Sequence, residues 1–271
     1  MNMRLNWPEY AIEAWALGSF MVSAAFATAL VERPEYGVAG LIASDAARRA
    51  LIGLAMGATA IALIYSPWGK RSGAHMNPAV TLTFLALGKV KRGDAIGYIA
   101  AQFVGGLAGV AIALALLGER FAAPPVAFVL TQPAHGPRLA FALEWLMSFV
   151  LMTAVLTLSS HKQLARYTGL FAGGLVATFI ALEAPYSGMS MNPARSFSSA
   201  ALAGQWMDLW IYFVAPPLGM WTAALVHTKR RARVGCAKLV HGRAERCIHC
   251  GYEPLHLEER IPLGGLRHET D

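Results

Sequence analysis

The chain alternates long apolar stretches with short polar segments. A membrane-spanning helix needs about 20 apolar residues to cross a hydrocarbon core of about 30 Å. Six stretches approach that length: residues 10 to 31, 46 to 66, 94 to 117, 138 to 159, 167 to 184 and 206 to 227. The pattern therefore predicts an all-α membrane protein with six transmembrane helices.

Two shorter apolar runs lie between these spans, from Val80 to Leu87 and from Ser196 to Leu202. Each is too short to cross a bilayer. Each follows a copy of one motif, S-G-x-x-M-N-P-A, at residues 72–79 and 187–194. Asn is a preferred N-cap residue and Pro is favoured at the first helical position, so each motif is expected to start a helix. The two runs are predicted to be re-entrant half-helices.

The order of spans and half-helices repeats along the chain. Repeat one covers about 8–118 and repeat two about 138–228. Three spans separate the half-helices, so the repeats are expected to be inverted, with the half-helices entering from opposite faces. Glu13 and Glu144 occupy corresponding positions in spans one and four. Acidic groups inside a membrane usually face the bundle interior with a partner, so we expect both to bind backbone exposed by the short helices.

Composition agrees with this interpretation. The 271 residues are 56% hydrophobic and 14% charged, against about 25% charged in a typical soluble domain. The net charge of +7 does not indicate a nucleic-acid partner, because the basic residues fall between apolar runs and in the tail. The positive-inside rule then predicts that both termini are cytosolic. The expected location is the plasma membrane. The first span contains Glu13 and lacks a convincing cleavage site, so it is expected to be retained rather than removed as a signal peptide.

The half-helices predict a polar waist. Irregular backbone at membrane depth must be buried in protein or line a watery cavity, so the two N-termini are expected to meet near the midplane. Each N-terminus carries about half a positive charge, which repels cations and protons, while the Asn amides donate hydrogen bonds to a neutral molecule. Arg195 lies where the helix dipole disfavours a positive charge, which favours a role in a pore. The predicted midplane residues are Asn77, Pro78, Ala79, Asn192, Pro193 and Ala194.

The paired motifs, together with Glu13, Glu144 and Arg195, resemble the aquaporin and glycerol-facilitator family of membrane channels over residues 8 to 228. The resemblance implies a right-handed bundle of six tilted helices that assembles as a homotetramer, with a pore in each subunit. It implies passive flow of water or small neutral solutes, without catalysis or a cofactor for transport. His75 resembles a histidine that braces the cytosolic half of the pore; gating there is the alternative.

The family builds an outer constriction from four positions, which the resemblance assigns to Met56, Ile180, Met189 and Arg195. The assignment of Met56 requires one extra residue in the first loop. Gly57 precedes its asparagine by 20 residues, whereas Gly173 precedes its own by 19. Without that extra residue, the position falls on Gly57.

Only the arginine of this set is typical of the family. Water-selective members usually have Phe, His, Cys and Arg, and glycerol facilitators have Trp, Gly, Phe and Arg. Ser196 follows the arginine where glycerol facilitators usually have Asp, which favours the water group. Flexible methionines either occlude a filter or yield to a bulkier solute, so the transported molecule stays open. Plain helix packing is the alternative role for the three apolar residues.

The tail, residues 229–271, lies outside the resemblance and holds all three cysteines of the chain. Cysteine and histidine ligands in a set of four are typical of tetrahedral Zn²⁺. A cytosolic tail disfavours disulfides. A redox-active dithiol, His249 as a replacement ligand, and no special role remain alternatives. The candidate ligands are Cys236, His241, Cys247 and Cys250, in the pattern C-x4-H-x5-C-x2-C.

Three other functions are compatible with parts of the sequence pattern. A closed or gated membrane protein whose metal- or redox-responsive tail carries the function is the main alternative to an open channel. An ion-coupled transporter also uses broken helices, but neither half-helix contains an acidic residue. An enzyme is disfavoured because the membrane part has no nucleophile–base arrangement and no phosphate-cradling loop.

Overall fold

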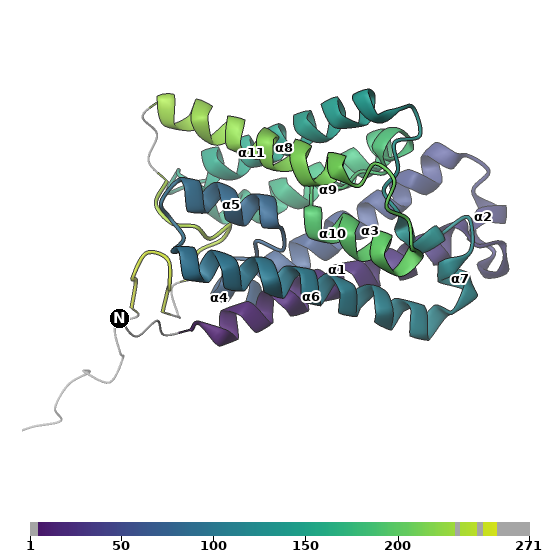
Figure 1. Cartoon of the computed structure of the whole chain (residues 1–271), viewed down its shortest axis with the longest axis horizontal. Coiled ribbons are helices and arrows are strands. Elements are labelled where there is room, and N and C mark those ends of the chain that lie inside the picture. Colours follow the sequence, from purple (N-terminus) through teal and green to yellow (C-terminus); the bar gives the residue numbers. More distant parts are fainter. Residues whose placement is uncertain (1–4, 231–233, 243–245, 254–271) are drawn as a thin grey trace, which may run out of the picture.

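The computed structural model describes residues 5–230, 234–242 and 246–253, and within these ranges its regular elements are all helices. The long helices lie side by side in one bundle (Figure 1). The predicted all-α fold is therefore confirmed. The six long helices are α1 (Trp7–Glu32), α3 (Asp45–Tyr65), α6 (Arg92–Leu117), α8 (Pro137–Ser159), α9 (Thr168–Ser187) and α11 (Trp210–Lys229).

Two half-helices begin inside the bundle, at the asparagines of the repeated motif. They are α5 (Pro78–Ala86) and α10 (Pro193–Ala203). The Asn77 side chain caps α5 by accepting from the backbone N–H of Ala79 at 2.8 Å. Asn192 caps α10 through the N–H groups of Ala194 and Arg195. Each Asn-Pro pair thus starts a helix in the way the sequence predicts.

Short helices connect the long ones, and the two repeats differ in the loop before the half-helix. In repeat one, α3 ends at Tyr65 and a new helix starts at Pro67. In repeat two, α9 continues past Pro185 to Ser187. The one-residue difference in spacing between the repeats falls in this segment. The short elements are η1 (Pro34–Tyr36), α2 (Val38–Leu41), α4 (Pro67–Ser72), α7 (Glu119–Ala122), η2 (Ala127–Val129) and η3 (Ala165–Tyr167).

Glycines bring the helices together in pairs. Helix α1 packs along α6, α3 along α9, and α8 along α11. A Cβ atom on Gly105 would lie 2.0 Å from the backbone oxygen of Ala14. A Cβ on Gly57 or Gly173 would lie 2.6 Å from the backbone oxygen of the other glycine. Only residues without a side chain allow such close approach, as is common where helices cross in membranes.

Helix α11 differs from the other five long helices. By length and composition, five helices of the described chain can cross a membrane, and α11 is not among them. Pro216 and Pro217 lie inside it, and tryptophan, tyrosine and histidine residues dilute its apolar character. Its 20 residues still span about 30 Å at 1.5 Å per residue. Its place in the bundle therefore depends on packing against α8 rather than on a continuous apolar sequence.

We predict that Gly173→Ala destabilises the protein, whereas Gly174→Ala does not. The added methyl at Gly173 would meet the Ile61 side chain at 2.4 Å, and overpacking of this kind costs about 1 to 3 kcal/mol. Gly174 is exposed and has nothing within 4 Å, so its substitution gains up to about 1 kcal/mol of helix propensity. Thermal unfolding of the two purified variants measures the difference. Equal midpoints would mean that the α3–α9 contact adapts to the extra methyl.

Candidate functional site

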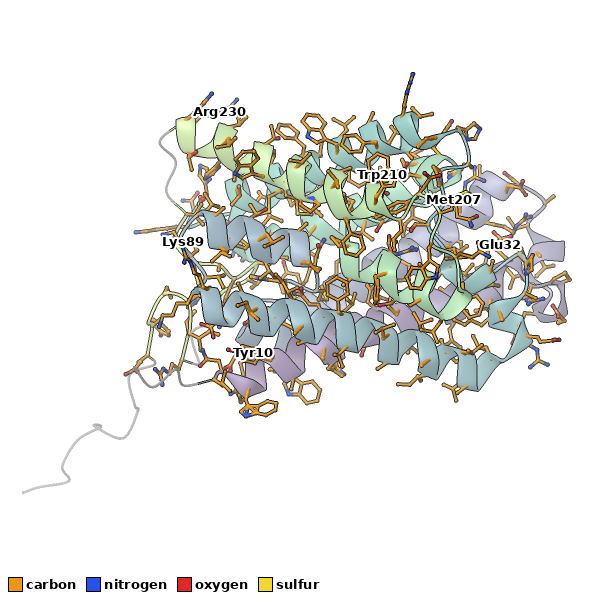
Figure 2. All side chains as sticks on the ribbon, in the orientation of Figure 1. Tyr10, Glu32, Lys89, Met207, Trp210 and Arg230 are labelled. Atoms are coloured by element: carbon orange, nitrogen blue, oxygen red, sulfur yellow. The ribbon has the colours of Figure 1, made fainter. Side chains whose placement is uncertain are left out.

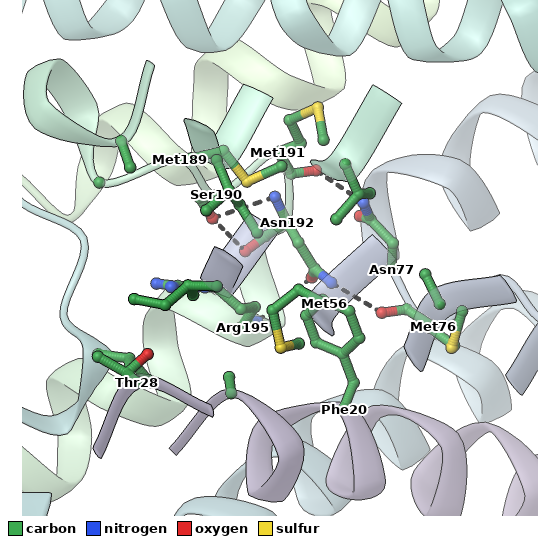
Figure 3. Close-up of a pocket in the computed structure, with 18 of the residues that line it drawn as sticks. Phe20, Thr28, Met56, Met76, Asn77, Met189, Ser190, Met191, Asn192 and Arg195 are labelled. Carbon is green, nitrogen blue, oxygen red and sulfur yellow. Dashed lines mark hydrogen bonds between the residues drawn. The ribbon is translucent and has the colours of Figure 1, made fainter. Parts of the chain in front are cut away.

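A cavity of about 510 Å³ runs between the helices and past both half-helix N-termini. Figure 3 shows Asn77 and Asn192 facing each other within it, with Met56 and Phe20 on the opposite wall. At one end, which we call the Arg195-side mouth, the cavity reaches the start of α3 and the segment before α8. At the other end, the tail-side mouth, its lining includes Leu239 of the tail. The wall between them comes mainly from α1, α3, α8 and α9.

The two asparagines tie the half-helices to each other. The Asn77 amide nitrogen donates to the backbone oxygen of Met191 at 2.6 Å, and the Asn192 amide nitrogen donates to that of Met76 at 2.7 Å. Each amide oxygen meanwhile caps its own helix. Every group of the two side chains is thus fixed except the second N–H of each amide, because an amide nitrogen has two donors.

Glu13 holds the first re-entrant loop. Its carboxylate accepts from the Ser72 hydroxyl at 2.8 Å and from the backbone N–H groups of His75 and Met76 at 3.0 and 2.6 Å. Gln102 of α6 donates to the same carboxylate at 2.8 Å. Glu13 is fully buried, so these donors replace the water that it has lost.

Glu144 holds the second loop in the same way. It accepts from the Ser187 hydroxyl and from the backbone N–H groups of Ser190 and Met191, each at 2.7 Å. The sequence predicted the pair of glutamates but not their serine partners. The signal was present, because each serine opens its copy of the repeated motif. Gln102, by contrast, has no counterpart in repeat two, and no sequence motif predicted its bond to Glu13.

Both loops contain strained backbone at equivalent positions. Ala74 and Met76 have φ of 53° and 51°, and Met189 and Met191 have φ of 47° and 54°. Non-glycine residues rarely adopt this left-handed region, and such strain persists only where the surroundings enforce it. The glutamates enforce it here, since the loop N–H groups that they bind would otherwise be unpaired in a membrane interior.

All four residues assigned to the outer constriction line the cavity: Met56, Ile180, Met189 and Arg195. Gly57, the alternative to Met56, instead lies at the contact of α3 with α9. The Arg195 guanidinium extends from α10 toward the end of the cavity where Thr28 lies (Figure 3). Its Nη1 atom is buried and has no hydrogen-bond partner within the described chain. Arg195 thus borders the cavity and keeps one guanidinium nitrogen without a hydrogen-bond partner among the described residues.

Ser196 supports the loop from behind rather than lining the cavity. Its hydroxyl bonds to the hydroxyls of Thr131 and Ser190 at 2.8 and 2.6 Å. Ser190 in turn donates to the backbone oxygen of Asn192 at 2.9 Å. The three hydroxyl groups connect the segment before α8 to the second half-helix, and no motif in the sequence indicates this connection.

The fold and cavity match those of known channels. The model of the major intrinsic protein family matches residues 9–227. The chain belongs to the major intrinsic protein family. It is therefore a membrane channel and not an enzyme, as its resemblance to that family predicted.

Individual relatives agree with this assignment. Over 227 residues the chain is 32% identical to aquaporin NIP3-1 of Arabidopsis thaliana, covering 80% of this chain and 67% of the relative. It is 33% identical to aquaporin NIP2-3 of Zea mays, covering 78% and 69%. About one third of each relative thus lies outside the match. The structure of the aquaglyceroporin from Plasmodium falciparum shares the fold, with a TM-score of 0.67 at 20% identity over 82% of this chain and 96% of that one.

His75 connects the family's first loop to the tail, which the family match does not include. Its Nε2 atom lies 2.6 Å from the backbone oxygen of Ala237, and its Nδ1 atom lies 3.0 Å from the Thr81 hydroxyl. A carbonyl oxygen only accepts, so Nε2 carries a proton. The sequence predicted a bracing or gating role for His75, but it did not reveal the partner.

The tail lies against the tail-side mouth. The backbone N–H of Leu239 donates to the oxygen of Gly73 at 3.2 Å, and the Lys238 ammonium donates to the oxygen of Lys70 at 2.9 Å. Val234, Ala237 and Leu239 are buried in the same apolar cluster as residues of α5 and α8. Residues 231–233, 243–245 and 254–271 of the predicted tail lie outside the described residues.

The four predicted metal ligands of the tail lie together. The ligand atoms of Cys236, His241, Cys247 and Cys250 are all within 4.8 Å of one another. The hydrogen bond that Cys236 shares with Cys247 lowers the pKa of the Cys247 thiol to about 3, whereas it raises the pKa of Cys236. His249, the alternative ligand, instead contacts the backbone oxygen of Ser72 at 3.2 Å.

We predict that Glu144→Leu abolishes most of the folded protein. The change leaves two backbone N–H groups and the Ser187 hydroxyl without their acceptor, at about 1 to 3 kcal/mol for each group. Size-exclusion chromatography of detergent extracts measures the folded yield. Glu119→Leu, at an exposed position of α7, is the control and should keep the normal yield. A normal yield from Glu144→Leu would show that the loop does not depend on the carboxylate.

Proposed function

We propose that this family member is a passive channel for water or small neutral solutes and excludes ions and protons. The observation that carries the proposal is the cavity that passes both asparagine-capped half-helix N-termini. Asn77, Pro78, Ala79, Asn192, Pro193 and Ala194 form its midplane in this proposal. Transport of this kind needs no cofactor, because the solute moves down its own gradient.

A neutral solute would form hydrogen bonds with donors that are held in fixed positions along the cavity. The second N–H of the Asn77 amide and that of the Asn192 amide have no hydrogen-bond partner among the residues that the structure describes, and both side chains border the cavity. A water molecule or a hydroxyl group accepts from both in turn. Since both amide oxygens already accept from the N–H groups of the helices that they cap, these side chains contribute chiefly donors to the cavity.

Cations meet a repulsive field at the same place. Each half-helix contributes about half a positive charge at its N-terminus, and the two N-termini face each other. Arg195 adds a full positive charge further along the cavity. A proton or metal cation would therefore lose hydration in a region that gives it no compensating negative charge.

Met56, Ile180, Met189 and Arg195 form the outer constriction in this proposal. Three of the four are apolar, so Arg195 supplies the polar contact and the remaining wall contacts the apolar side of a solute. Methionine side chains are flexible and adapt to different shapes. Flux measurements with glycerol and urea gradients determine whether the constriction passes these solutes as well as water.

The proposed location is the plasma membrane. The distribution of charge supports an orientation in which the tail lies in the cytosol. Lys89 and Arg230 lie at the tail end of the bundle, and Glu32 lies at the opposite end (Figure 2). Arg48, an exception to the positive-inside rule, bonds Glu32 at 3.0 Å and is locally neutralised. We further propose a channel unit of residues 1–228 that assembles as a homotetramer, with residues 229–271 as a cytosolic tail that contains the cysteine and histidine residues.

The proposal is tested by reconstituting the purified protein in liposomes and following volume changes by stopped-flow light scattering. Water flux well above that of empty liposomes, without a proton leak, supports it. Parallel gradients of glycerol and urea identify the solute class. A proton or potassium current would overturn the proposed exclusion of ions.

We predict that Arg195→Ala weakens ion exclusion while the pore still conducts. Loss of the guanidinium removes one positive charge and widens the constriction, so proton leak should rise on the order of tenfold, equivalent to about 1.4 kcal/mol of barrier. A pH-sensitive dye inside the liposomes measures the leak. Arg138→Ala, at an exposed position of α8, is the matched control. An unchanged leak in a conducting Arg195→Ala channel would remove Arg195 from the filter.

A further inference from the structure

The cysteine–histidine cluster of the tail has the composition and spacing of a tetrahedral metal site. The Sγ atoms of Cys236 and Cys247 are 3.5 Å apart, and His241 Nε2 is 3.3 Å from Cys250 Sγ. Ligands bound to Zn²⁺ at about 2.3 Å stand about 3.8 Å from one another in a tetrahedron. The observed distances are close to that value. Three thiols and one imidazole form a Cys₃His set, which is a common structural zinc site.

A disulfide explains the cluster less well. All three cysteines are free thiols, and the Sγ–Sγ distance between Cys236 and Cys247 is well beyond the bond length of about 2.05 Å. A disulfide would use two thiols and leave the third thiol and His241 without a role. A metal ion uses all four groups.

The ligands bracket the part of the tail that contacts the channel. Cys236 immediately precedes Ala237, and His241 comes two residues after Leu239. Between these two ligands, Ala237 accepts from His75 and Leu239 donates to Gly73. A metal bound by Cys236 and His241 would therefore fix both ends of this short segment at once.

Leu239 is the residue through which this segment reaches the pore. It is buried against the tail-side half of the bundle and lines the cavity. Gly73 lets the tail come this close, because a Cβ there would lie 3.0 Å from the Lys238 side chain. An apolar side chain at the mouth of a pore gives passing water no hydrogen bond, so it hinders flow.

We propose that Zn²⁺ bound by Cys236, His241, Cys247 and Cys250 holds residues 236–241 across the tail-side mouth and thereby closes the channel. Metal binding orders the segment because the four ligands converge only when the tail is folded. Loss of the metal releases Leu239 and opens the mouth. This regulation rests on the proposed function, since it controls the flux through the same cavity.

The metal is tested first, on the full chain. We expect about one Zn²⁺ per chain by elemental analysis, and Co²⁺ substitution should give the visible absorption of a tetrahedral thiolate site. Cys247→Ser with Cys250→Ser should abolish both signals, as should His241→Ala. His161→Ala, at an exposed position outside the cluster, should keep them. A chain without metal, or one with a Cys236–Cys247 disulfide, would overturn the proposal.

Flux then tests the closure. In proteoliposomes, Zn²⁺ should lower flux about tenfold relative to chelator-treated protein, as expected when the metal keeps about nine tenths of the channels closed. Leu239→Ala should bind metal normally but conduct equally with and without it. Hydrogen exchange at the Leu239 amide, which is bonded to Gly73, should quicken on metal removal.

The outcomes separate the two proposals. Bound Zn²⁺ with equal flux and equal Leu239 exchange before and after chelation would overturn the closure, while leaving the channel function intact. Absence of flux in every preparation, including folded Leu239→Ala and the metal-free variants, would overturn the channel function itself. Flux that falls on metal removal would reverse the proposed sign and overturn the closure as well.

Discussion

The structure depends on two buried carboxylates that satisfy irregular backbone deep in the bundle. A membrane interior offers no water to unpaired N–H groups, so a chain that turns back halfway must supply its own acceptors. Glu13 and Glu144 do this for the two loops, each with a serine and two backbone donors. The strained φ angles, the positions of the half-helix N-termini and the shape of the cavity all follow from these contacts.

Much of this arrangement was predictable because its signals are local or repeated. Asn-Pro pairs indicate where helices start, and the length of an apolar stretch indicates a membrane span. A duplicated motif predicts two equivalent loops. The confirmed all-α fold and family follow from these signals. The sixth span shows the limit, because Pro216 and Pro217 weaken the apolar pattern of a helix that packing against α8 holds in place.

The remaining features depend on contacts between distant segments, which no spacing rule describes. Gln102 reaches Glu13 across 89 positions, and Ala237 reaches His75 across 162. The proximity of the four candidate metal ligands was suggested by their residue types, yet the contact of Leu239 with the cavity was not. The bond that links His75 to the tail gives this chain a feature beyond the region that the family model matches.

The exchange of hydrogen bonds between Asn77 and Asn192 also constrains how the protein is made. Each amide needs a backbone oxygen that belongs to the other half of the chain. While a ribosome is still producing repeat two, the first half-helix has its cap and its glutamate but lacks the acceptor for its amide. These hydrogen bonds therefore form only after residue 192 has been synthesised, and they require the two halves of the chain to dock against each other.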